Sequence, residues 1–295
     1  MHGLHLQRRR LRLHRMHLLL TEGLQPRGLP SLFQARRYRS MSLRLLSWCA
    51  TGVLVASSAS AVDPFEIQVY DGTANEAGAV GLELHINRVV SGLRSATPPE
   101  LPLSHQTHLT LEPSFGAQSW WEIGGYFQST LRPDGVYDFS GVKLRSKFVV
   151  PEGTYEHLRL GINLELSRIP ERYEAGRWGA EVRPILAWEN RYWFFATNPI
   201  LTFGLEGLGD GPDFEPAAAA KIKLFDTFAL GFEYYAALGR VADPLPADEQ
   251  SHFLYETLDL FSLPRVEVNF GLGEGLTAAS SQLVAKLILG YAWEG

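Results

Sequence analysis

Apolar and polar residues alternate along most of this chain with a period of two. Residues 157–168 read HLRLGINLELSR, in which leucine or isoleucine alternates with mainly charged or polar residues. Successive side chains of a β-strand point to opposite faces, so this period predicts a strand with one aliphatic and one ionic face. Similar segments recur from Val80 onward, and their number predicts about twelve strands.

The connections between these segments alternate in length. Residues 190–191, 226–227 and 263–265 are predicted to be short turns, whereas residues 169–177 and 240–252 are predicted to be long loops. Bacterial outer-membrane barrels have this asymmetry, with short turns on the periplasmic side and longer loops outside. Only a closed sheet pairs every backbone group in hydrocarbon. We therefore predict an all-β fold, a closed antiparallel up-and-down transmembrane β-barrel of about twelve strands over residues 79–295.

The N-terminal residues differ from the rest of the chain. Residues 1–40 hold nine arginines and one glutamate, which predicts a spurious or disordered extension, with a nucleic-acid-binding arm as the alternative. Residues 41–61 read MSLRLLSWCATGVLVASSASA and have the basic start, apolar stretch and A-x-A ending of a cleaved signal peptide. We expect residues 62–78 to form an N-terminal periplasmic segment.

Cleavage after Ala61 changes the charge of the chain. It removes ten arginines and one glutamate and leaves 17 basic and 31 acidic residues, a formal charge of −14. An acidic chain argues against a nucleic-acid partner. It also removes Cys49, the only cysteine, so the mature chain is expected to form no disulfide.

Polar residues of the predicted strands are expected to face an enclosed lumen. Basic residues of the fourth and fifth strands predict a field that favours anions, and the alternative is that paired charges fill the lumen. The expected lumen-lining residues are Glu83, His85, His108, Glu112, Glu122, Tyr126, Lys143, Arg145, Lys147, His157, Arg159, Asn163, Glu165, Glu181, Arg183, Glu189, Lys221, Lys223, Glu233, Tyr235, Glu267 and Lys286.

Aromatic residues gather near the predicted strand ends. Such a girdle is typical of the membrane–water interface, and ordinary core aromatics are the alternative. The expected interface residues are Trp121, Tyr137, Tyr155, Trp178, Trp188, Tyr192, Trp193, Tyr255, Tyr291 and Trp293.

The signal peptide, the amphipathic strands and the aromatic-rich end LILGYAW resemble Gram-negative outer-membrane β-barrels. The size and the opening PFEIQVYD are also similar to barrels related to the meta-pathway phenol-degradation proteins, a resemblance that implies transport of hydrophobic molecules. Two departures stand out. The chain ends on Glu294-Gly295 rather than on an aromatic residue, and about sixteen residues before the first strand are too few for the N-terminal plug of FadL-like channels.

Candidate chemistry is sparse. His105 and His108 with Glu112 are metal-ligand types, but alternate sides of a strand would separate the two histidines, so no metal site or cofactor is predicted. Ser251 beside His252, and His157 near Ser167, lack a third partner for a lipid-modifying hydrolase.

We expect a passive outer-membrane channel or transporter for small solutes, apolar or anionic. The alternative is a non-conducting structural or binding barrel whose acidic loops contact partners. Expected partners are outer-membrane lipid, the barrel-assembly machinery during biogenesis, and the solute.

Overall fold

The computed structural model describes residues 62–174, 176–206, 211–224, 226–261 and 265–294. The predicted N-terminal extension and signal peptide lie outside these residues. Within the described part of the chain, no helix is long and apolar enough to cross a membrane.

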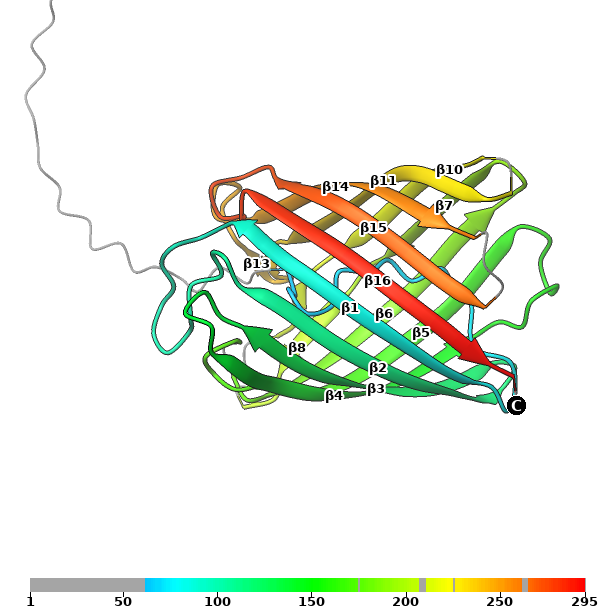
Figure 1. The fold of residues 1–295 in the computed structure, drawn as a ribbon, viewed down its shortest axis with the longest axis horizontal. Helices are drawn as coiled ribbons and strands as arrows, with labels where there is room; N and C mark the ends of the chain where they lie inside the picture. The colour runs from blue at the N-terminus through cyan, green and yellow to red at the C-terminus, as the bar shows by residue number, and fades with distance from the viewer. Residues whose placement is uncertain (1–61, 175, 207–210, 225, 262–264, 295) are drawn as a thin grey trace, which may run out of the picture. The chain divides into compact units, whose positions relative to one another are not determined.

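Twelve antiparallel strands close into a barrel, as the alternation predicts (Figure 1). Each pairs with its neighbour in the chain, and pairing of β1 with β16 closes the ring. The twelve are β1 (Val80–Ser91), β2 (Thr107–Gln118), β3 (Trp121–Leu131), β4 (Tyr137–Val149), β5 (Leu158–Arg168), β6 (Trp178–Glu189), β7 (Trp193–Asn198), β10 (Ala217–Leu224), β11 (Phe228–Ala237), β14 (Ser251–Leu260), β15 (Val266–Gly275) and β16 (Leu283–Trp293).

Two neighbouring strands of the barrel are each broken in two, and the sequence pattern does not predict these breaks. The strand that begins as β7 breaks at residues 199–200 and continues as β8 (Leu201–Gly204), and both parts pair with β6. The next strand begins as β9 (Asp213–Phe214), which pairs with β8, and continues after a break as β10. Pro199 and Pro216 lie at these breaks, and proline has no N–H for a sheet ladder. Two further short strands, β12 (Gly239–Arg240) and β13 (Asp243–Pro244), pair beyond β11.

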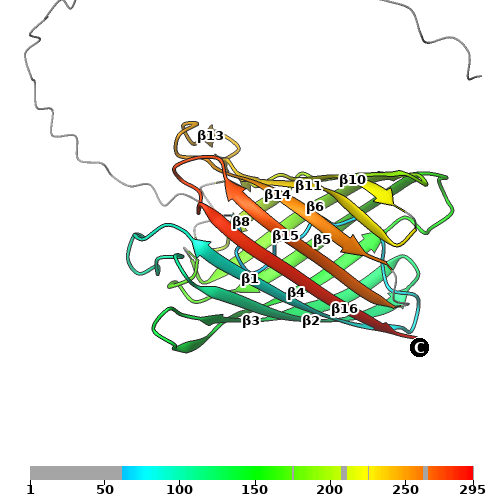
Figure 2. The same ribbon diagram turned by 45° about the horizontal axis from the view of Figure 1, so that its top comes forward.

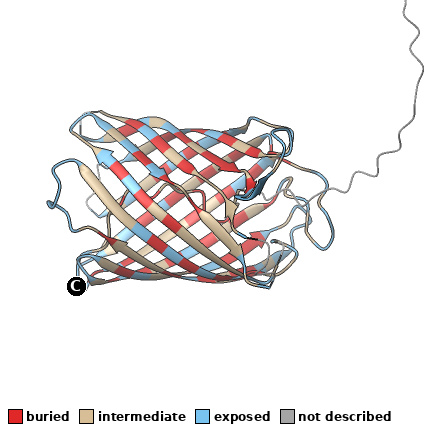
Figure 3. Ribbon diagram, turned by 180° about the vertical axis from the view of Figure 1, so that it is seen from behind, coloured by how far each residue is buried: buried red, intermediate tan, exposed pale blue. Residues whose placement is uncertain are grey.

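Burial alternates along each strand, so bands of buried and exposed residues cross the barrel wall (Figure 3). In β5, Asn163 and Glu165 are buried, whereas Leu164 and Leu166 are 39% and 43% exposed. The same inversion holds for Leu144, which is 67% exposed beside buried Arg145. Apolar residues therefore form the outer skin and polar residues the interior, as a membrane-spanning barrel requires.

Both ends of the sheet lie at the same end of the barrel, since Val80 of β1 pairs with Trp293 of β16. The short connections 119–120 and 190–192 belong to this end, and the long connections 92–106 and 238–250 to the other. The turned view in Figure 2 shows the longer loops gathered opposite the C-terminus. We call these the short-turn end and the long-loop end.

Residues 62–79, the N-terminal segment, run through the barrel instead of lying outside it in the periplasm (Figure 1, blue). Phe65, Glu66, Ile67 and Tyr70 are each at most 6% exposed. Extended chain advances roughly 3.3 Å per residue, so even this short segment reaches from one end of the barrel to the other. The segment expected in the periplasm thus lies in the lumen as a single extended strand of chain.

Candidate functional site

The candidate site is the lumen itself, formed by the inward faces of the strands and the N-terminal segment. The segment enters at the long-loop end, where Val62 packs with the cluster around Val89, Phe253 and Val284. It leaves at the short-turn end, where the Gly78 amide donates a 2.8 Å hydrogen bond to the Gly116 carbonyl. Its direction is therefore opposite to that of β1, which follows it.

Three carboxylates of the segment pair with cations of the barrel wall. Asp63 lies 2.7 Å from the Lys143 ammonium, and Asp71 lies 3.4 Å from the Arg159 guanidinium. Between them, Glu66 contacts the wall cations of β6 and β4, at 2.9 Å from Arg183 and 3.4 Å from Lys143. The segment thus supplies negative charge where the wall is positive.

Tyr70 is the central anchor of the segment. The Asn198 side chain accepts a hydrogen bond from the Tyr70 amide at 2.7 Å and donates one to its carbonyl at 3.1 Å, as a neighbouring strand would. The Tyr70 hydroxyl lies 2.5 Å from that of Tyr126, and the Arg183 guanidinium lies 4.5 Å from the ring centre. Asn198 ends β7 at the strand break, so this break places an amide at the segment.

The short-turn end of the segment fits closely against β2 and β3. The Asn75 amide donates to Glu122 at 2.6 Å, and the Asn75 side chain donates to Ser114 at 2.8 Å. A Cβ added at Gly116 would lie 2.1 Å from the Glu76 carbonyl oxygen. Glycine at 116 is therefore a condition for this approach.

Two further ion-pair networks belong to the wall. Arg145 bridges Glu112 and Glu122 at 2.6 Å each, on the side of β2 to β4. Across the lumen, Glu233 lies between Lys221 and Lys286, and the Lys286 ammonium also donates to the Ile67 carbonyl at 2.9 Å. The lumen is therefore filled by paired charges together with the segment.

Most residues expected in the lumen are buried there. Those less than 9% exposed are His85, His108, Glu112, Glu122, Tyr126, Lys143, Arg145, Asn163, Glu165, Arg183, Lys221, Glu233, Tyr235 and Lys286. Partly exposed, or open to a cavity, are Glu83, Lys147, Arg159, Glu181, Glu189, Lys223 and Glu267. His157 differs, because it precedes β5 in a turn, is exposed, and has its ring 6.0 Å from that of Trp188 on the outer face.

Among the aromatic residues expected at the interface, Tyr255 is placed inside the barrel instead. It is 1% exposed and packs edge-on against Tyr235 at 5.5 Å. Gly273 opposite it leaves the space, since a Cβ there would lie 2.3 Å from the Tyr255 ring. The remaining nine are exposed or half-buried: Trp121, Tyr137, Tyr155, Trp178, Trp188, Tyr192, Trp193, Tyr291 and Trp293.

The two serine–histidine pairs considered for a hydrolase do not form hydrogen-bonded catalytic pairs. The Ser251 hydroxyl is buried and lies 3.3 Å from that of Ser280, whereas the His252 ring bonds Tyr234 and Gln250. His157 and Ser167 are at opposite ends of β5.

His108 and Glu112 both face the lumen, but His105 does not lie beside them as a third metal ligand. The His108 ring contacts that of Phe65 at 4.7 Å, and His105 lies before β2 with its carbonyl accepting from Arg88. A different histidine, His85, lies beside Glu112 at 3.2 Å.

The alternation of the strands does not reveal part of the site, namely Asp63, Glu66, Tyr70 and Asp71 of the segment and Asn198 of the wall. The available signal was weak. Three acids within nine residues, in a stretch without helical period, indicate an extended acidic strand-like segment. Nothing local shows that its partners lie on β4, β5 and β6.

Cavities lie beside the segment at both ends of the barrel. The larger, about 310 Å³, lies at the short-turn end and is polar, with Glu83, Glu122, Lys147 and Glu267 in its lining. The smaller, about 20 Å³, lies at the long-loop end and is lined mainly by apolar residues, among them Ile67.

Comparison with known proteins finds similarity of fold. No protein-family model matches this chain, and no curated protein matches it. Among solved structures, it is similar to the COG4313 outer membrane channel from Pseudomonas putida F1, with a TM-score of 0.51, 11% identity, and coverage of 77% of this chain and 100% of that one. A KdgM porin (TM-score 0.47, 9% identity, 73% and 99% covered) and a NanC porin (0.46, 10%, 73% and 100%) also match. At these identities the likeness is one of barrel architecture.

Proposed function

We propose that this protein is a passive outer-membrane channel for small anionic solutes, and that the N-terminal segment occupies its pathway in the structure described. The observation that carries the proposal is the pairing of three segment carboxylates with wall cations. Asp63, Glu66 and Asp71 hold positions that anions would otherwise take beside Lys143, Arg159 and Arg183.

The segment is held by contacts that a solute anion can replace. Its acidic side chains make ion pairs, and its backbone is bonded by side chains of the wall such as Asn198 and Lys286. If the segment leaves, Lys143 loses Asp63, its nearest acid, and keeps Glu165. Arg183 loses Glu66 and keeps the nearer Glu181. Lys143, Arg159 and Arg183 lie on the adjacent strands β4, β5 and β6, and basic side chains facing a pore favour anions.

A non-conducting barrel is the competing function, and the filled lumen favours it. The cavity at the long-loop end is only about 20 Å³, and paired charges and the segment occupy the lumen beside it. The two functions differ in whether displacement of the segment opens a pathway.

Planar-bilayer recordings distinguish them. The wild type is compared with the triple variant Asp63→Asn, Glu66→Gln, Asp71→Asn and with a chain lacking residues 64–77. We expect both changes to raise the conductance and to shift the reversal potential in a KCl gradient toward that of chloride. Glu76→Gln is the matched control, since Glu76 belongs to the same segment and is exposed.

A pair of arginine variants tests which residues cause the chloride selectivity. In the deleted chain, Arg183→Gln should reduce chloride selectivity, whereas Arg168→Gln should not, because Arg168 faces outward against Trp178. Heat-dependent gel migration verifies that each variant forms a barrel. If folded variants without the segment carry no current, the channel proposal is discarded in favour of a structural barrel.

A further inference from the structure

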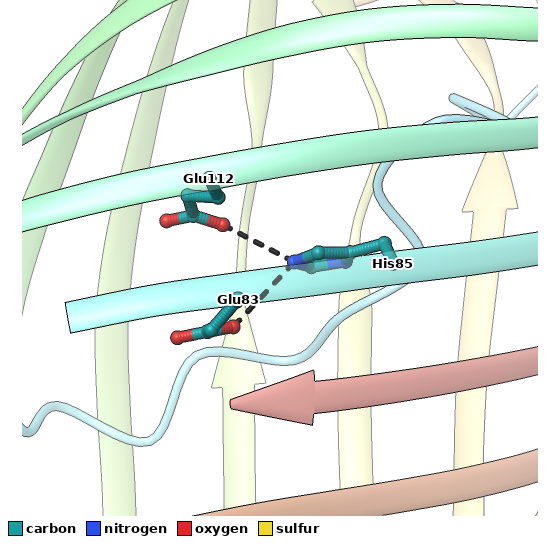
Figure 4. Close-up of side chains that lie close together, drawn as sticks. All are labelled: Glu83, His85 and Glu112. Atoms are coloured by element: carbon teal, nitrogen blue, oxygen red, sulfur yellow. Dashed lines mark hydrogen bonds and ion pairs between the residues drawn. The ribbon is translucent and has the colours of Figure 1, made fainter. Parts of the chain in front are cut away.

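Three potential metal ligands meet on the inner wall, apart from the contacts of the acidic segment residues. Glu83 and His85 are two positions apart on β1, so both point inward, and Glu112 of β2 is the register partner of Glu83. Figure 4 shows the two carboxylates and the imidazole turned toward one another from these adjacent strands.

The distances among them fit coordination to one ion. His85 Nε2 lies 3.2 Å from Glu112 Oε2 and 3.5 Å from Glu83 Oε2, and all three atoms lie within 4.8 Å of one another. Ligand atoms bound tetrahedrally to zinc at its usual bond lengths are about 3.3 Å apart. The 3.2 Å contact is a hydrogen bond, whereas 3.5 Å is long for one, so an ion among the three atoms would replace a single hydrogen bond.

The surroundings orient the ligand of β2, whose Oε2 meets His85 Nε2 in a hydrogen bond that an ion would replace. Arg145 Nε donates to the other oxygen of Glu112 at 2.7 Å, which orients that carboxylate and leaves its Oε2 directed at His85. Such contacts behind a ligand fix its direction. Gln68 of the N-terminal segment donates at 3.3 Å to Glu83 Oε2, the same oxygen that faces His85, so this hydrogen bond would share that oxygen with the ion. His85 is fully buried, and its Nε2 donates to the Glu112 carboxylate at 3.2 Å, so an ion bound at Nε2 would take the place of that proton. Its Nδ1 makes no hydrogen bond among the described residues.

A polar cavity beside the cluster gives an ion a way in and leaves room for a water molecule as the fourth ligand. Glu83 lines the polar cavity of about 310 Å³ at the short-turn end, which has room for water beside the cluster. Three protein ligands and one water are the usual set of an open zinc site. One imidazole among the ligands favours zinc-like ions over calcium or magnesium, which prefer oxygen ligands.

From this geometry we propose that Glu83, His85 and Glu112 bind a divalent transition-metal ion of the zinc type. The ion bridges β1 and β2 and, through Gln68 on Glu83, lies against the N-terminal segment. This site is independent of the proposed conductance, because binding is measured without any transport assay.

The test is zinc titration of untagged, chelator-treated protein in detergent, followed by calorimetry, with cobalt absorption as a report of tetrahedral geometry. We expect one zinc per chain in the wild type and at least about tenfold weaker binding in His85→Gln, since loss of a ligand exceeds the effect of loss of a supporting contact. His108→Gln is the matched control, because His108 is equally buried on the inner wall and Nε2 of its ring is without a partner among the described residues.

A second variant protects the test against misfolding. Glu83→Gln alters the least buried of the three ligands, whose side chain is 23% exposed, and should weaken zinc binding in a folded barrel. The proposal is overturned if the wild type takes up no zinc. It is equally overturned if folded Glu83→Gln and His85→Gln bind zinc as well as His108→Gln does, or if excess magnesium displaces zinc from the wild type.

Discussion

The Glu66 carboxylate lies 2.9 Å from the Arg183 guanidinium inside the barrel, and each side chain is at most 4% exposed. Glu66 also faces Lys143, so one segment acid compensates two wall cations. Removal of one partner of a buried pair costs about 3 kcal/mol or more where the other charge stays unpaired. Arg183 keeps Glu181 at 2.6 Å, so loss of Glu66 removes one of its two ion pairs and costs less than that. This pair should therefore control how often the segment leaves the lumen.

We predict that Glu66→Gln increases exposure of the segment on the order of 10-fold, because the loss of a charged hydrogen bond costs about 1.5 kcal/mol. The measurement is the rate at which a maleimide labels Ile67→Cys, a position 3% exposed in the wild type. The mature chain is expected to have no other cysteine. Glu76→Gln serves as the control, and equal labelling rates in the two variants would show that Glu66 does not retain the segment.

A second prediction concerns the two hydroxyls of Tyr70 and Tyr126, which lie 2.5 Å apart. Loss of either hydroxyl should lower the free energy of unfolding by about 1 kcal/mol, because its buried partner loses a hydrogen bond. The double variant Tyr70→Phe, Tyr126→Phe should cost less than the sum of the two single changes. Urea unfolding in lipid vesicles gives the three values, with exposed Tyr137→Phe as the control. Strict additivity would mean that the hydroxyls do not interact.

The sequence predicts the barrel well because the information is local. Alternation of leucine with polar residues defines both faces of β5 without reference to its neighbours, and the predicted range 157–168 differs from Leu158–Arg168 by one residue. Most of the expected lumen residues follow from the same rule. In an amphipathic strand, the apolar side chains face the membrane and the polar side chains face the lumen.

The N-terminal segment could not be predicted in the same way, because its partners are distant in the chain. Tyr70 and Asn198 are 128 residues apart, and Lys286 lies 219 residues from Ile67. β14 illustrates a second limit, since its inward face carries Phe253 and Tyr255. Their orientation is decided by register with β11 and by the glycines of β15, not by the character of β14 itself.

A third prediction compares two glycines with the same backbone angle. Gly72 and Gly135 both have φ near +82°, but a Cβ at Gly72 would lie 2.9 Å from the Arg159 Cβ, whereas nothing lies within 4 Å at Gly135. Alanine at either position costs about 1 kcal/mol of backbone strain. Gly72→Ala should cost more, because the segment must also move away from β5. Unfolding midpoints and labelling of Ile67→Cys measure the difference, and equal effects would show that the wall at Arg159 yields freely.

The fourth prediction concerns Glu256, an acidic residue on the outer face of β14. It is exposed, and its register partners Phe232 and Leu272 are also exposed, at 51% and 45%. A carboxylate among lipid-facing apolar residues is unfavourable, and more so toward the middle of a strand. Glu256→Leu should therefore raise the free energy of unfolding in lipid vesicles by about 1 kcal/mol. Glu274→Leu, next to the end of β15, is the control and should have a smaller effect. A loss of stability in Glu256→Leu would mean that this carboxylate meets a polar partner at the membrane face and not lipid.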